Sequence, residues 1–289
     1  MNDDFKKLVN DEYEKIQKGE SCFYIGEGNP DADILIIGNE CAIGDDDSRE
    51  CSEDERRKIK ERIIAKDNVE RWKELLKQGY DIEDISRELQ DYNGETGSNK
   101  YYPLFPNLGQ KCIVRTEINK DKGGEKGTAR TWVQYQKLID WIYDEKGFDR
   151  NNFIDFHLKA FHTELSQIPR KHSGAKNKET ADSIQKRLDG LFSNPFFQKF
   201  PVVIIAAGHY VRNYGIDIIG TEENKRFNVV YKGDIGKSGW INLHESSDSR
   251  RLLLHTKHFA AAISNDYIKE IAEQVLTLKG RINKNYDNE

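Results

Sequence analysis

The sequence predicts an α/β protein with a central four-stranded, mostly parallel sheet and helices on both faces, a three-layer α/β/α arrangement. Two observations indicate this class. Short apolar runs alternate along the chain with longer segments of helical periodicity, the order typical of parallel strands joined by crossover helices. Three of the four runs are also almost continuously apolar, as expected for strands buried on both faces.

Four strands and three helices follow from these patterns. The predicted strands cover residues 33–38 (DILIIG), 153–158 (FIDFHL), 201–208 (PVVIIAAG) and 251–256 (RLLLHT). Helices are predicted over residues 128–143, 179–192 and 265–278, because apolar side chains recur there every three or four positions. Parallel strands that alternate with helices imply right-handed crossovers.

Residues 45–100 are more highly charged than the segments around them. We expect them to form a helical insertion within one α/β domain that spans residues 1–289. Ser52 and Glu55 have the spacing of a capping box at the start of a first helix. A second, shorter helix is expected over residues 81–92.

The composition excludes several classes of protein. The 45 Lys and Arg residues are outnumbered by 50 Asp and Glu, so nucleic-acid binding would require a local basic face. No apolar run approaches the length of a membrane span, and the polar N-terminus does not read as a signal peptide. The four cysteines form no C-x-x-C pair. These features predict a soluble cytoplasmic protein with reduced thiols and no membrane contact.

The sequence also lacks the common cofactor motifs. It contains no G-x-x-x-x-G-K-[ST] phosphate-binding loop and no G-x-G-x-x-G turn that opens a helix. The histidines do not have the H-E-x-x-H spacing of a zinc site. We therefore expect no cofactor and no metal, and a metal hydrolase that uses several histidines is kept as a competing hypothesis.

Histidines gather at the predicted carboxyl ends of the strands, where open parallel sheets bind ligands. Five of the seven fall at or just after such an end: His157, His162, His209, His255 and His258. Imidazoles exchange protons near neutral pH, so this pattern predicts a polar pocket for acid–base chemistry. His255 is the first candidate because it ends a buried strand. His157 is equally well explained as a core histidine, and His209 as a helix cap.

Other side chains near these ends are further candidates. Asn39 and Glu40 directly follow the first strand, and Glu40 is either a general base that positions water or an acid at a helix N-terminus. Phe105 lies in the aromatic and proline-containing segment YYPLFPNLG, which either stacks on a base or covers the sheet edge. Lys257 and Lys159 are candidates for holding phosphate groups.

The order of these pieces resembles the uracil-DNA glycosylase superfamily over most of residues 20–278. The resemblance is carried by ILIIGNECAIG (34–44), VVIIAAGHY (202–210) and LLLHTKHFAAAIS (252–264). The prolines of both family motifs are missing, which marks a divergent member. The resemblance implies an N-glycosidic hydrolase of DNA repair that acts on a base flipped out of nucleic acid.

The resemblance also implies roles for particular residues. Asn39 and Glu40 would position the attacking water, and His255 would stabilise negative charge on the departing base. Phe105 would stack on the base, and His157 is the nearest match to the residue that reads the base edge. His209, Lys257 and His258 are the remaining candidates for substrate binding.

A second hypothesis keeps the fold and the nucleic-acid or nucleotide partner but has no catalytic activity. The altered motifs favour it. The two hypotheses differ in whether Glu40 and His255 face one pocket. The sequence gives no prediction of the oligomeric state.

Overall fold

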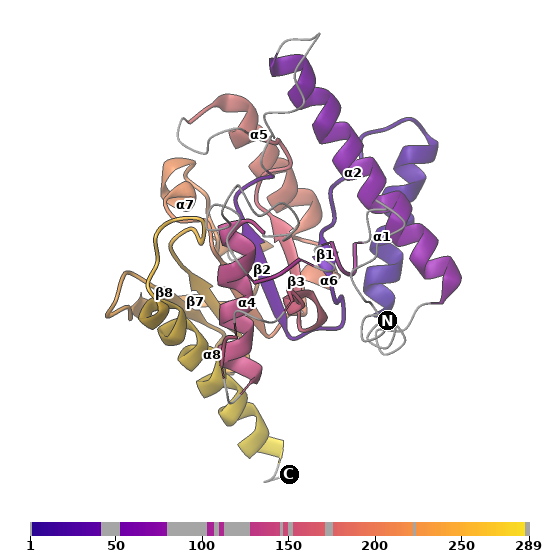
Figure 1. Ribbon diagram of the computed structural model, residues 1–289. Coiled ribbons are helices and arrows are strands. Elements are labelled where there is room, and N and C mark those ends of the chain that lie inside the picture. Colours follow the sequence, from indigo (N-terminus) through magenta and orange to yellow (C-terminus); the bar gives the residue numbers. More distant parts are fainter. Residues whose placement is uncertain are drawn as a thin grey trace, which may run out of the picture.

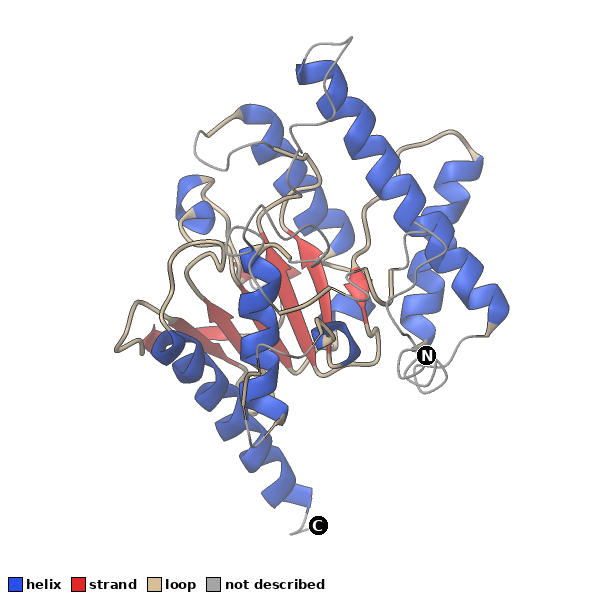
Figure 2. Cartoon of the chain, in the orientation of Figure 1, coloured by secondary structure: helices blue, strands red, loops and turns tan. Residues whose placement is uncertain are grey.

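A seven-stranded sheet lies at the centre of a mixed α/β fold (Figure 1, Figure 2). The computed structural model describes residues 2–41, 53–79, 103–106, 110–112, 128–144, 147–149, 153–170, 176–221 and 224–286. The strand order is β1-β3-β2-β4-β9-β8-β7. The four inner strands β3, β2, β4 and β9 run parallel, whereas β1, β8 and β7 are antiparallel additions at the two edges.

The elements have the following bounds. The strands of the sheet are β1 (Glu27–Gly28), β2 (Ile34–Gly38), β3 (Ala160–Glu164), β4 (Val202–Ile205), β7 (Val230–Asp234), β8 (Asn242–Glu245) and β9 (Leu252–His255), and β5 (Gly220–Thr221) and β6 (Asn224–Lys225) form a separate hairpin. The helices are α1 (Asp3–Gln17), α2 (Glu53–Gln78), α4 (Arg130–Tyr143), α5 (Lys178–Lys186), α6 (Pro195–Gln198), α7 (Tyr210–Asn213) and α8 (Asn265–Tyr286). A 3-10 turn, η3 (Phe156–Leu158), precedes β3, and a π turn, η4 (Arg187–Leu191), follows α5.

The two faces of the inner strands pack against different helices. Alternate residues of a strand point to opposite faces, and Leu35, Val203 and Leu253 belong to a cluster that includes side chains of α1, α2 and α5. Ile36, Ile204 and Leu254 belong to a second cluster with side chains of α4 and α8. Figure 1 shows α4 and α8 side by side across one face of the sheet, and α1 beside α2. This packing explains why the strands are almost continuously apolar.

The predicted strand over residues 153–158 is wrong. Its last three residues form η3, and the second parallel strand is β3 instead. The side-chain oxygen of Gln136 accepts hydrogen bonds from the backbone N–H groups of Asp155 and Phe156, each at 2.8 Å. Those two amides therefore do not pair with a neighbouring strand. All five residues of β3 are buried, but three of them are polar. A search for continuous apolar runs therefore does not find this strand.

The three predicted helices are present with different ends. α4 matches its predicted range closely, and α8 extends to Tyr286. The segment 179–192 begins as α5 but continues as the π turn η4, which carries the buried Arg187. These differences concern the ends of the helices and leave their order unchanged.

The first helix of the predicted insertion, α2, packs into the core. Trp72 of α2 is fully buried, contacts Phe5 with ring centroids 4.8 Å apart, and donates its indole N–H to the Gly26 carbonyl. Ser52 and the predicted helix over 81–92 lie outside the described residues. No helix in the described ranges has both the length and the apolar character needed to span a bilayer.

Candidate functional site

A cavity of about 470 Å³ opens where β2, β4 and β9 reach their carboxyl ends. The segments after these strands line it together with α7 and the turn between β7 and β8. The lining residues are Asn39, Ala207, Gly208, His209, Tyr210, Asn213, Trp240, Lys257, His258 and Ala261. Four of these were predicted from the sequence as site residues: Asn39, His209, Lys257 and His258.

The tight turn after β4 brings two of these segments together. Gly208 has a φ of 57°, a left-handed conformation that glycine adopts without steric cost. Its N–H donates to the Thr256 carbonyl at 2.9 Å, and a Cβ at this position would lie 3.2 Å from the backbone nitrogen of His258. The close approach of the chain after β4 to the chain after β9 therefore requires glycine here.

His255 is held within the protein by both of its ring nitrogens. Nε2 lies 2.8 Å from the Gly208 carbonyl oxygen, and since a carbonyl only accepts, Nε2 carries the proton. Nδ1 then accepts from the side-chain amide of Asn242 at 3.4 Å. Burial lowers the pKa of His255 to about 4, so the imidazole is neutral at pH 7. His255 is not among the lining residues of the cavity, although its ring contacts the lining residue Trp240.

Aromatic rings form one wall of the cavity. The rings of His209 and Trp240 stack with centroids 5.8 Å apart, and Trp240 meets the His255 ring edge-on at 4.9 Å. The Trp240 carbonyl accepts from the Tyr267 hydroxyl, which in turn accepts from the backbone N–H of Lys257. These bonds connect the β7–β8 turn to the segment after β9. The Lys257 ammonium lies 5.1 Å from the Tyr267 ring centroid.

Asn39 and Glu40 lie on a segment that extends beyond the sheet. The Asn39 carbonyl accepts from Ser166 N–H at 2.8 Å, while its side-chain oxygen is buried without a hydrogen-bond partner among the described residues. Glu40 is half-buried, and its carboxylate acts electrostatically on both Tyr210 and Glu164. Burial, and then Glu40, raises the pKa of Tyr210 above the ordinary value of a phenol.

Three predicted site residues lie elsewhere. Phe105 is buried in the core cluster that includes α1 and α2, where its ring is not placed to stack on a ligand in the cavity. His157 lies in η3 at the amino end of β3, packed on Phe156 with ring centroids 3.8 Å apart. Lys159 also precedes β3 and lies over the Tyr143 ring. Both expectations for residues 157 and 159 depended on the misplaced strand.

The true carboxyl end of β3 presents Glu164, which sequence reasoning missed. Glu164 lies beside Gly38 in the register of β2 and β3, and its carboxyl packs directly on the Gly38 backbone. His162, two residues earlier, faces the same side of the sheet, with Nε2 3.6 Å from Glu164 Oε1. The run AFHTE contains a signal, because its last three residues are polar and the run ends in a carboxylate.

Trp240 and Asn213 were also missed. Neither residue directly follows a predicted strand, which is where site residues were expected. Trp240 follows a glycine-rich turn, and Asn213 lies at the end of the short helix α7. A large aromatic residue beside the Gly-Lys-Ser-Gly turn was the available sign for Trp240.

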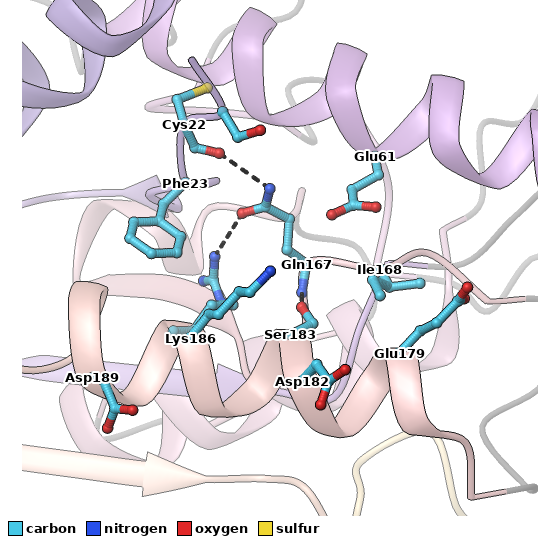
Figure 3. Close-up of a pocket in the computed structure, with 12 residues that line it drawn as sticks. Cys22, Phe23, Glu61, Gln167, Ile168, Glu179, Asp182, Ser183, Lys186 and Asp189 are labelled. Carbon is cyan, nitrogen blue, oxygen red and sulfur yellow. Dashed lines mark hydrogen bonds between the residues drawn. The ribbon is translucent and has the colours of Figure 1, made fainter.

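A second cavity of about 660 Å³ lies between α2 and α5 (Figure 3). Glu61, Glu179, Asp182 and Asp189 contribute carboxylates to its lining. Gln167 crosses it, donating to the Cys22 carbonyl at 3.1 Å and accepting from Arg187 at 3.3 Å (Figure 3). Lys186 and Arg187 also line this cavity, but the four carboxylates outnumber these two cations, which disfavours binding of a phosphate backbone.

The chain matches no protein-family model, and no curated protein is significantly similar to it in sequence. Within the described ranges, no three His, Cys, Asp or Glu side chains come together as metal ligands. The first cavity therefore has to be interpreted from its own chemistry. It offers aromatic faces, side-chain amides and one lysine, with a carboxylate at its border.

Proposed function

We propose that this chain is an N-glycosidic hydrolase that acts on a base in nucleic acid, on a three-layer fold of the uracil-DNA glycosylase type. The observation that carries the proposal is the lining of the cavity at the carboxyl ends of β2, β4 and β9. Trp240 and His209 offer faces on which a base stacks, and Lys257 offers a charge for a phosphate. The inner strand order β3-β2-β4-β9 supports the fold type.

The hydrolysis needs a group that activates water next to the bound nucleotide. Water adds to the sugar carbon, the bond from that carbon to the base nitrogen breaks, and the base departs with the electron pair. Glu40 is the carboxylate on the β2 segment beside the cavity, and in this mechanism it accepts the proton of the water. Asn39 lines the cavity and orients the water.

The position of His255 favours a second candidate function, base or nucleotide binding without catalysis. Its Nε2–H donates to Gly208 within the protein, so it does not contact a departing base in this conformation. Neither Glu40 nor His255 is part of the described lining of the cavity. Binding alone requires only the aromatic, amide and lysine groups.

A base-release assay tests the proposal. Single-stranded oligonucleotides that carry uracil, hypoxanthine or an oxidised base are incubated with the protein and then treated with alkali. We expect strand cleavage for at least one base, reduced by about 100-fold or more in Glu40→Gln, the typical contribution of a general base. Glu273→Gln on the exposed face of α8 is the matched control and should cleave like the wild type.

Binding of the same oligonucleotides separates the two candidates. Binding without release by the wild type would exclude the hydrolase and support the binding protein. If the protein neither binds these oligonucleotides nor releases a base from them, both candidates are contradicted.

A further inference from the structure

The turn between β7 and β8 brings Trp240 to the cavity, although its two strands lie at the edge of the sheet. The turn covers residues 235–241, and its residue in the cavity lining is Trp240. Ile241 is fully buried, whereas Lys237 and Ser238 are exposed. Exposed connecting segments move more than the elements they join. The contacts that fix this turn therefore decide where the Trp240 ring lies.

Helix α8 holds the exposed part of the turn through Glu270. One carboxylate oxygen of Glu270 accepts hydrogen bonds from the Ser238 N–H at 2.9 Å and from the Ser238 hydroxyl at 2.8 Å. The other oxygen accepts from the Lys237 N–H at 3.0 Å. Hydrogen bonds to an ionised acceptor are about twice as strong as those between neutral groups. Glu270 is thus a charged anchor for residues that the core does not cover.

Tyr267 holds the other end of the same turn. It lies three residues before Glu270, a spacing that places both side chains on one face of α8. The buried Tyr267 hydroxyl donates to the Trp240 carbonyl at 2.8 Å and accepts from the Lys257 N–H at 2.9 Å. Trp240 and Lys257 both line the cavity, whereas Tyr267 does not. A single hydroxyl behind the cavity therefore joins two separate parts of its lining.

The chain is closely packed where these two parts meet. A Cβ on Gly239 would lie 2.4 Å from the Lys257 ammonium nitrogen and 2.9 Å from the Tyr267 ring. The ammonium in turn lies 5.1 Å from the centroid of that ring. The position of the Lys257 charge therefore depends on the turn and on Tyr267, and not only on its own backbone.

We propose that Tyr267 and Glu270 are positioning residues for the ligand of this cavity. They hold the Trp240 ring and the Lys257 ammonium in one arrangement before the ligand arrives. A nucleotide, which has both a ring to stack and a phosphate, gains from this arrangement because its binding does not have to order the turn. The choice of ligand rests on the proposed function, whereas the ordering of the turn does not.

Nitrogen-15 relaxation of the free protein tests the ordering. The backbone order parameters of residues 237–239 should be about 0.85 in the wild type and below about 0.6 in Glu270→Ala. Glu270→Gln keeps one acceptor oxygen and should give values between these two. Tyr267→Phe removes only the hydroxyl and should shift the indole N–H signal of Trp240.

Two control variants match these substitutions. Glu273→Ala removes an exposed carboxylate from the same helix. Tyr143→Phe removes a tyrosine hydroxyl that bonds to Lys279 and lies outside the cavity lining. Neither control should alter the order parameters of residues 237–239 or the Trp240 signal.

Binding of a uracil-containing single-stranded oligonucleotide measures the consequence for the ligand. We expect Tyr267→Phe and Glu270→Ala each to bind about tenfold more weakly than the wild type, because binding must then order the turn. Both controls should bind within about threefold of it. Circular dichroism shows which variants are folded. Glu270→Ala tests the inference even if Tyr267→Phe does not fold, because the Glu270 side chain is half-buried.

The inference is overturned by either of two results. One is an unchanged set of order parameters at residues 237–239 in Glu270→Ala. The other is wild-type affinity for the oligonucleotide in both Glu270→Ala and folded Tyr267→Phe. If the wild type binds no oligonucleotide, the proposed function fails, and the free-protein NMR signals alone decide whether α8 positions the turn.

Discussion

Two buried polar regions meet at the end of β3, and they differ in how their hydrogen bonds are used. On one face, Arg187 donates to the carbonyls of Glu164 and Tyr24, and to the side-chain oxygens of Thr163 and Gln167. We call these residues the Arg187 network, part of which Figure 3 shows. On the other face lie Tyr135, His162 and Glu164, which we call the Glu164 cluster. Each of the three has one side-chain atom without a hydrogen-bond partner among the described residues.

The contrast indicates what each region does. The Arg187 network joins segments that are more than 100 residues apart in sequence, and each hydrogen bond it makes ends on the protein itself. Burial lowers the pKa of Arg187 to about 10, so the guanidinium is still charged at pH 7 and needs these acceptors. A satisfied network stabilises the fold, whereas buried polar atoms without a hydrogen-bond partner cost free energy.

The largest expected effect comes from breaking the Arg187 network. Arg187→Met should lower the free energy of unfolding by about 3–5 kcal/mol, because it leaves buried oxygens without their donor. Urea denaturation measures the loss. Arg212→Met, on an exposed residue of α7, is the control and should change stability by less than about 0.5 kcal/mol. A similarly small effect at Arg187 would show that the network is not structural.

An intermediate effect is expected from crowding the Glu164 cluster. A Cβ at Gly38 would overlap the Glu164 carboxyl, so Gly38→Ala should displace that group and cost about 1–3 kcal/mol of stability. Gly280→Ala in α8 meets nothing within 4 Å and should instead stabilise the protein, by up to about 1 kcal/mol. Thermal unfolding compares the two. Equal responses would contradict the packing of Glu164 on Gly38.

The smallest expected effect is a pH dependence from His162. The unfolded chain binds a proton on this residue below about pH 6.5, but the folded protein does so only near pH 3. The contribution of His162 to stability should therefore fall as the pH drops, by roughly 1–2 kcal/mol between pH 7 and 5. Glu164 acts in the opposite direction, because its raised pKa makes stability fall as the pH rises above about 4.5.

Two variants isolate the histidine contribution to this pH dependence. His162→Gln should flatten the decline between pH 7 and 5, measured as the difference in urea midpoints from the wild type. His209→Gln, on an exposed ring, should leave the decline unchanged. An unaltered slope in His162→Gln would show that His162 is not held neutral by burial.

The inner strands were predictable wherever their own residues are apolar. β2, β4 and β9 were found from continuous apolar runs, but β3 was not, because His162, Thr163 and Glu164 are polar and still buried. What makes β3 a strand is pairing with β2 and packing under α4, and a local pattern contains neither. The edge strand β7 is mostly exposed and gave no apolar signal.

The candidate site was predictable to the extent that it follows strand ends. Asn39, His209 and Lys257 were found by that rule and line the cavity. Phe105 was placed in the site because it is aromatic, yet tertiary packing buries it in the core. Trp240 was missed because it reaches the cavity from a turn between edge strands.

The central claim is that the carboxyl-end cavity, and not the Arg187 network, binds the base. The most direct test is a nitrogen-15 NMR titration of the protein with a uracil-containing single-stranded oligonucleotide. The indole N–H of Trp240, assigned with Trp240→Phe, and the Nε–H of Arg187 are followed together. We predict that the Trp240 signal shifts and the Arg187 signal does not. A shift at Arg187 with an unchanged Trp240 signal would contradict the account.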